Sequence, residues 1–112
     1  MTHKMLTAAG IANKQGRFPK PPDNKNYAVY FDDIEKEGAD RVPTPYKAGL
    51  PCIVHHSISV ELYEPRPDPE AESAFETQLD AQGLDWSKED RYWIQSEQCY
   101  QVVYSYNYTE KI

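Results

Sequence analysis

The sequence predicts an α+β domain in which a four-stranded, largely antiparallel sheet carries one long helix and a short N-terminal helix on one face. Three observations lead to this fold class. Residues 53–63 alternate between apolar and polar side chains, which is the period of a half-buried strand. Residues 69–82 place apolar side chains at helical spacing behind an aspartate. Residues 98–108 repeat the period of two, with tyrosines on one side.

The length of 112 residues indicates one domain, divided into an N-terminal helix with a proline-rich loop over 1–26 and an α+β core over 27–112. The net charge of −6 is unevenly spread. Residues 1–26 hold five basic side chains and one acidic, a sum of +4, and the remainder holds seven basic and seventeen acidic, a sum of −10. Such an acidic core is poorly suited to phosphate contacts, which argues against nucleic-acid binding. The basic segment suits an acidic surface, such as that of a neighbouring copy.

The N-terminal segment predicts a short helix over residues 2–12, weakened by Gly10. Residues 13–26 predict a loop, because glycine, proline, asparagine and aspartate recur in it. Phe18 is the one large apolar side chain of this loop. The loop is either a flexible connector or a contact segment anchored by Phe18, and the residues leave both alternatives open.

The first predicted strand covers residues 27–31, with its odd-numbered side chains on one face. Asp32 and Asp33 are expected to end it. Residues 34–49 follow neither the helical nor the strand period, so we expect a long excursion between two strands. An excursion of this length in a compact domain is usually functional or mobile.

The central predicted strand, residues 53–63, turns its even-numbered side chains inward and its odd-numbered ones toward water or a partner. Prolines on both sides limit it. The helix that follows begins at Asp68, an N-cap, with Pro69 in the first helical position, and ends near Gly83. Its expected apolar face consists of Ala71, Ala74, Phe75 and Leu79.

Residues 91–95 and 98–108 predict a terminal hairpin. The tyrosine stripe of 98–108 suits either a sheet core with its rim or a platform that stacks nucleic-acid bases. A base-stacking platform normally has basic neighbours, and this strand contains no Lys or Arg. We therefore interpret the stripe as core and protein–protein contact.

The sequence contains no residue pattern that favours a metal or cofactor site. His55 and His56 are adjacent in a strand, so they point to opposite faces and do not chelate one metal together. The acidic residues after position 31 lack the ligand spacing of a calcium loop. Cys52 and Cys99 are isolated and form no disulfide framework, so we interpret them as small buried side chains.

The sequence has no nucleophile elbow and no phosphate-binding glycine loop. We therefore predict no catalytic residue, no cofactor, no metal and no small-molecule substrate. No apolar run approaches the ~20 residues of a membrane span, and residues 5–9 are too short for a secretory core. We expect synthesis in the cytoplasm and no membrane association.

Six stretches in order carry a family resemblance: Tyr27–Tyr30 before an acidic corner, Gly38–Asp40, Ser59–Tyr63 leading to Asp68–Glu70, Gly83–Leu84, Trp86–Lys88, and Ile94–Tyr104. Together they resemble small proteins encoded in the head–tail gene cluster of long-tailed phages and prophages. These are often described as minor capsid or tail-component proteins. By fold, that family is similar to tail terminators, also called head–tail joining proteins. The resemblance covers most of residues 5–105.

The resemblance implies a structural virion protein and no enzyme. Proteins of this kind form a homo-oligomeric ring, typically a hexamer, that caps the tail tube protein and docks to the head connector protein. It places the chain in the host bacterial cytoplasm during assembly and at the head–tail interface of the virion. The family supplies no ring-contact motif, so the contact residues follow from the loop and the excursion alone. The candidates are Arg17, Phe18, Lys20, Asp32, Asp33, Asp40, Arg41, Tyr46 and Lys47.

Two alternatives remain. The chain is also suited to be a small bacterial adaptor or regulatory module that binds a protein partner through its acidic face. Nucleic-acid binding is a weaker alternative, and it would have to use the basic residues between positions 4 and 25.

Overall fold

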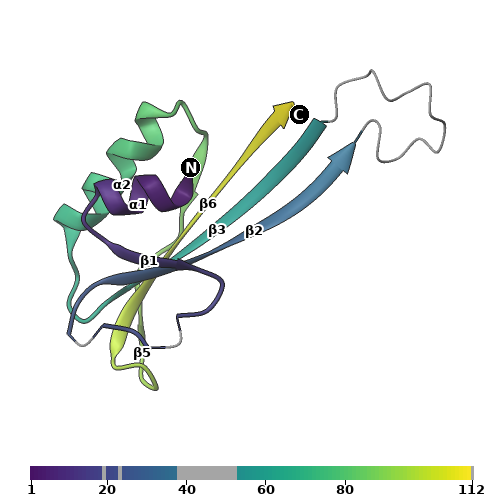
Figure 1. Ribbon diagram of the computed structural model, residues 1–112. Coiled ribbons are helices and arrows are strands. Elements are labelled where there is room, and N and C mark those ends of the chain that lie inside the picture. The colour runs from purple at the N-terminus through teal and green to yellow at the C-terminus, as the bar shows by residue number, and fades with distance from the viewer. Residues whose placement is uncertain (19, 23, 38–52, 112) are drawn as a thin grey trace, which may run out of the picture.

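A computed structural model describes residues 1–18, 20–22, 24–37 and 53–111, and for Lys36, Glu37 and Lys111 it describes the backbone only. Two helices and six strands follow one another along the chain (Figure 1). They are α1 (Thr2–Ala8), β1 (Ala12–Gln15), β2 (Tyr27–Glu37), β3 (Ile53–Glu64), α2 (Pro69–Ala81), β4 (Trp86–Lys88), β5 (Tyr92–Ile94) and β6 (Cys99–Lys111).

The strands form one mixed sheet in the order β1-β2-β3-β6-β4, with β5 also paired to β6. β1 runs parallel to β2, and the other pairs are antiparallel. The predicted four-stranded, largely antiparallel sheet with one long helix is therefore wrong. The sheet has six strands, and the helices are short, with 7 residues in α1 and 13 in α2.

Two strand segments account for much of the difference. β1 lies where a loop was predicted, because its four residues are mostly polar and its stability comes from pairing with β2. The Gly16 N–H extends this pairing by donating to the Tyr30 carbonyl at 2.7 Å. β2 continues through Asp32 and Asp33 to Glu37, so the predicted stop was also wrong. Acidic residues are tolerated there because this part of β2 runs beyond the helices (Figure 1). The rest of the predicted excursion lies outside the described residues.

The C-terminal half follows the prediction more closely. The Asp68 carboxylate accepts a hydrogen bond from the Ala71 N–H at 3.1 Å, which confirms the N-cap of α2. Gly83 ends the helix region with a φ of +68°, a conformation that favours glycine. The predicted terminal hairpin forms between β5 and β6, although β5 is only three residues long. β4 was not predicted, because three residues are too few to show a period.

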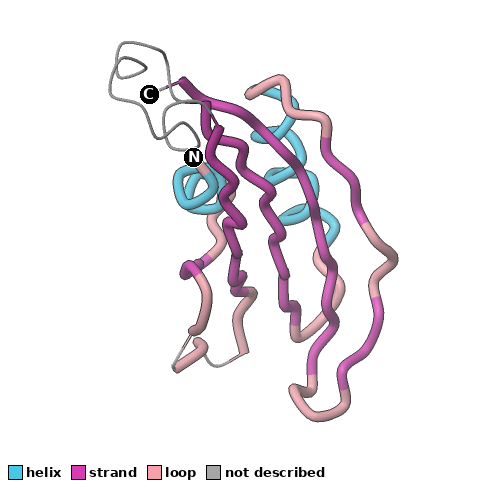
Figure 2. Tube along the Cα trace, turned by 90° about the vertical axis from the view of Figure 1, so that its right-hand side faces the viewer, coloured by secondary structure: helices cyan, strands magenta, loops and turns pink. Residues whose placement is uncertain are grey.

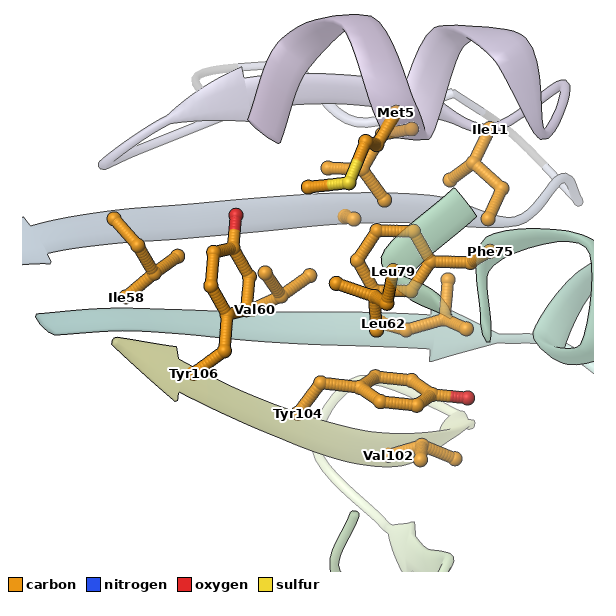
Figure 3. Close-up of a cluster of buried hydrophobic side chains, with 12 residues drawn as sticks. Met5, Ile11, Ile58, Val60, Leu62, Phe75, Leu79, Val102, Tyr104 and Tyr106 are labelled. Atoms are coloured by element: carbon orange, nitrogen blue, oxygen red, sulfur yellow. The ribbon is translucent and has the colours of Figure 1, made fainter. Parts of the chain in front are cut away.

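The core lies between one face of the sheet and both helices (Figures 2 and 3). Even-numbered residues of β3 and β6 point into it, as the alternation predicted, and Val60, Leu62, Val102 and Tyr104 are fully buried. Phe75 of α2 packs edge-on against Tyr104, with ring centroids 5.1 Å apart. We call the opposite side of the sheet the open face, because neither helix covers it.

Beyond the helices, β2, β3 and β6 continue together as a three-stranded arm (Figure 1). We define the arm as residues 32–37, 53–57 and 107–111. It gives the molecule an elongated shape, with extents of 55 × 28 × 22 Å. Within the described residues, β1 pairs with β2 only as far as Tyr30, so the outer edge of β2 has no strand partner along the arm.

Candidate interaction surface

The open face contains a groove of about 590 Å³ at the end of the sheet opposite the arm. The loop after β1 forms one wall, and β2 and β3 form the floor. We call it the tyrosine groove, and its main lining residues are Arg17, Phe18, Tyr27, Phe31, Glu61 and Tyr63.

Strand register builds the apolar part of the tyrosine groove. Tyr27 pairs directly with Tyr63 across β2 and β3, and their rings stack with centroids 5.0 Å apart. Phe18 meets Tyr27 edge-on at 5.7 Å. Phe31 lies four residues from Tyr27 on the same face of β2, beyond Val29, and is 44% exposed. The result is an apolar surface with a cluster of three contacting aromatic rings, and neither helix covers it.

A row of hydrogen bonds crosses three strands beside these rings. The Tyr63 hydroxyl donates to Glu61 at 3.0 Å and accepts from the Gln101 amide at 2.9 Å. The Tyr92 hydroxyl donates to the Gln101 side-chain oxygen. Burial, followed by the Glu61 carboxylate, raises the pKa of Tyr63, so its hydroxyl remains protonated. The row fixes the orientation of Tyr63 and Glu61 at the groove.

Three charged side chains line the tyrosine groove: Arg17, Glu61 and Glu97. Burial raises the pKa of Tyr27, and nearby Cys99 and Glu97 raise it further. Carboxylates therefore outnumber cations here by two to one. An apolar surface with this charge is suited to a segment that brings flat or cyclic apolar groups together with a positive charge.

The structure brings only some of the predicted contact residues together. Arg17 and Phe18 line the tyrosine groove, and Lys20 is exposed on the same loop. Asp33 is exposed on the arm, and Asp32 lies on its other face. The other four predicted contacts, Asp40, Arg41, Tyr46 and Lys47, lie outside the described residues.

Four groove residues were not predicted from the sequence: Tyr27, Glu61, Tyr63 and Glu97. One signal was available for Glu61 and Tyr63, because the odd-numbered residues of the strand over 53–63 were expected to face water or a partner, and the odd-numbered residues of 27–31 were expected only to share one face. The register that stacks Tyr27 on Tyr63 was not readable from either strand alone.

A second cluster lies in the arm on the opposite face of the sheet. His56 Nδ1 is 2.9 Å from the Asp32 carboxylate, and Nε2 is 2.8 Å from Glu110 Oε1. Tyr108 stacks on the imidazole with ring centroids 4.3 Å apart. Burial lowers the pKa of His56, but hydrogen bonds to Glu110 and Asp32 outweigh burial and raise the pKa above its ordinary value. The His56 side chain thus joins all three strands of the arm.

His55 points to the other face and is half-buried. The two histidines therefore diverge as the strand geometry predicted. Within the described part of the chain, no three His, Cys, Asp or Glu side chains are grouped to hold a metal ion. Cys99 is a buried free thiol, whereas Cys52 lies outside the described residues.

A partly buried ionic cluster joins the end of β3 to α2, with buried carboxyl groups of Glu64 and Glu72 and cations at the surface. Arg91 contacts Glu64 at 3.4 Å and Glu72 at 2.6 Å. Lys88 contacts Glu72 at 2.9 Å and Glu76 at 2.8 Å. These contacts hold the segment that carries β4 and β5 against α2, so the cluster is part of the folded framework.

The two most buried carboxyl groups of this cluster titrate in opposite directions. Burial raises the pKa of Glu64 to about 8, and a hydrogen bond shared with Glu72 adds to the increase. Burial would also raise the pKa of Glu72, but hydrogen bonds involving Arg91, Glu64 and Lys88 lower it overall. Glu64 is therefore neutral at pH 7 and Glu72 is ionised, an arrangement that avoids two buried negative charges side by side.

Among the described residues, no helix is long and apolar enough to span a membrane. The chain matches no protein family by sequence and no curated protein. Its fold is similar to that of a chain in the solved structure of the virion of a native gene transfer agent (GTA) particle. The two chains are 11% identical with a TM-score of 0.62, and the alignment covers 99% of this chain and 92% of the other. At this identity, the likeness establishes the fold.

Proposed function

We propose that this chain is a structural protein of a phage-like particle, and that it acts at the head–tail interface as a tail terminator or head–tail joining protein. The observation that carries this proposal is the fold similarity to a chain of a gene transfer agent virion over nearly the full length of both chains. A role of this kind depends on surfaces and requires no catalytic residue.

The placement of two surfaces on the sheet supports assembly into a ring. The arm and the tyrosine groove lie at opposite ends of the sheet and are made of different residues. Contacts between two different surfaces of identical chains repeat head to tail and close into a ring when the rotation permits. The ring, a hexamer in this proposal, caps the tail tube protein and docks to the head connector protein.

Tail tube polymerisation tests the proposal. Purified tail tube protein is allowed to polymerise with and without this chain, and tube length is measured by electron microscopy. We expect the chain to shorten the tubes at substoichiometric amounts and to appear at one tube end as a ring. Tubes of unchanged length with no bound chain would overturn the proposal. Val60→Asp, which is expected to unfold the domain, is the negative control.

A further inference from the structure

We propose that the tyrosine groove receives segment 38–52 of a second copy of this chain. The inference rests on the proposed ring and names the contact within it. Segment 38–52 lies outside the described residues, but its sequence and its two points of attachment are known. The groove belongs entirely to the described part of the chain.

The first support is chemical. The groove offers the rings of Phe18, Tyr27 and Tyr63, and aromatic-lined grooves are the surfaces that bind extended proline-containing segments. Segment 38–52 contains three prolines: Pro43, Pro45 and Pro51. A proline ring packs flat on an aromatic ring and brings little conformational entropy that binding must remove.

The second support is charge. Glu61 and Glu97 line the groove. The occupant carries Arg41 and Lys47 on either side of two prolines, with Asp40 as its one acidic residue. The predominantly acidic site and the predominantly basic segment are therefore complementary. The hydrogen bond from Tyr63 holds the Glu61 carboxylate in position for such a contact.

The third support is reach, which selects a second copy over the same chain. Segment 38–52 is attached at Glu37 and Ile53, which pair at the end of the arm. Glu61 lies eight residues along β3 from Ile53, or about 26 Å at ~3.3 Å per residue. Arg41 is four residues from Glu37 and Lys47 six residues from Ile53, which limits their backbones to about 14 and 20 Å from those attachments. The backbones of both cations therefore stop short of Glu61 in the same chain, and the stacked rings of Tyr27 and Tyr63 lie two residues farther along β3.

These constraints define a head-to-tail contact. The segment at the arm end of one copy enters the groove at the opposite end of the sheet in the next copy. Each copy then gives one segment and receives one, as a closed ring requires. Two sets of residues predicted as contacts, those near Phe18 and those near Arg41, become the two sides of one interface.

A peptide covering residues 39–50, with blocked ends, tests recognition directly on the full chain. We expect titration of the peptide to shift the backbone amide signals of Tyr27, Glu61 and Tyr63 in nuclear magnetic resonance spectra. Binding to Glu61→Gln/Glu97→Gln should weaken by roughly fivefold or more, because two charge contacts are lost. Asp85→Asn/Glu89→Asn is the matched control, since both side chains are exposed away from the groove, and its binding should be unchanged.

A peptide that shifts no groove signal, or that binds the wild type and the groove variant equally, would overturn the proposal. A peptide with glutamate at positions 41 and 47 should bind more weakly than the native sequence. Equal binding of both peptides would likewise contradict the charge-based recognition.

Charge reversal tests the contact between whole chains. The groove variant Glu61→Lys/Glu97→Lys and the segment variant Arg41→Glu/Lys47→Glu should each lose self-association. A mixture of the two should regain it, because each reversed groove meets a reversed segment. If both charge-reversal variants still assemble, the ring is supported and the proposed contact between groove and segment is contradicted. A wild-type chain that never assembles, with or without tail tube protein, would contradict the proposed ring. The peptide titration would still decide whether the groove recognises the segment.

Discussion

Replacing Glu64 with glutamine should remove most of the pH dependence of folding stability between pH 4.5 and about 8. In the wild-type fold, burial raises the pKa of Glu64 from 4.5 to about 8. A raised carboxyl pKa means that the folded state holds a proton that the unfolded state releases. The stabilisation is therefore complete below pH 4.5 and is lost as the pH rises through about 8.

The structure sets the size of this effect. A shift of one pKa unit corresponds to about 1.4 kcal/mol, so the full shift of Glu64 corresponds to about 5 kcal/mol. Glu64 and Glu72 share a hydrogen bond and titrate as a pair, so part of this shift belongs to the pair, and we expect a measured loss of about 3 kcal/mol across the window. Glutamine reproduces the neutral form of Glu64 and keeps groups that accept from Arg91 and donate to Glu72.

Urea unfolding at pH values below, within and above this window measures the effect, with fluorescence of the two tryptophans as the signal. The wild type should lose stability as the pH rises, and Glu64→Gln should keep only the loss that His56 contributes above pH 6.5. Glu89→Gln, an exposed substitution, should follow the wild type. Parallel curves for the wild type and Glu64→Gln would refute the assignment of a buried, neutral carboxyl group to position 64.

Three further predictions follow from the fold. The His56 imidazole should titrate above pH 6.5 in a magnetic resonance experiment, and Asp32→Asn should lower the midpoint of this titration. Because the pKa of His56 is raised in the folded state, His56 stabilises the arm below pH 6.5. This stabilisation is lost as the pH rises through the folded-state pKa. A midpoint at or below 6.5 would contradict the paired imidazolium. Val60→Asp should cost more than about 4 kcal/mol and unfold the domain, as seen by circular dichroism, because it buries an unpaired charge. Asp68→Ala should cost about 1 kcal/mol in urea unfolding through loss of the α2 N-cap, and a neutral result would show that the cap is dispensable.

The elements that were predicted from the sequence are those with a clear periodicity of apolar side chains or a clear capping pattern of their own. The inward face of β3 follows from strict alternation, and α2 follows from Asp68, Pro69 and an apolar stripe. β1 was missed because it is polar, short and stabilised by its neighbour. The length of β2 was misjudged because Asp32 looks like a strand end until His56 is placed opposite it.

The residues of the candidate surface also fall into a group that was predicted from the sequence and a group that was not. Arg17 and Phe18 were predicted as contacts because a large apolar side chain in a proline-rich loop stands out. The floor of the tyrosine groove was not predicted, since it depends on the pairing of Tyr27 with Tyr63. The register between two strands depends on their long-range pairing and on which face of each strand packs into the core. It therefore becomes known only from the folded structure.

The central claim is that this chain is a structural protein that works as a ring, and solution mass tests it most directly. Light scattering over a range of concentrations, with and without tail tube protein, should give a mass of six chains alone or on the tube. The 12.9 kDa chain makes the monomer and the ring easy to distinguish. A mass that stays at one chain in both conditions, at the highest concentration reached, would contradict the claim.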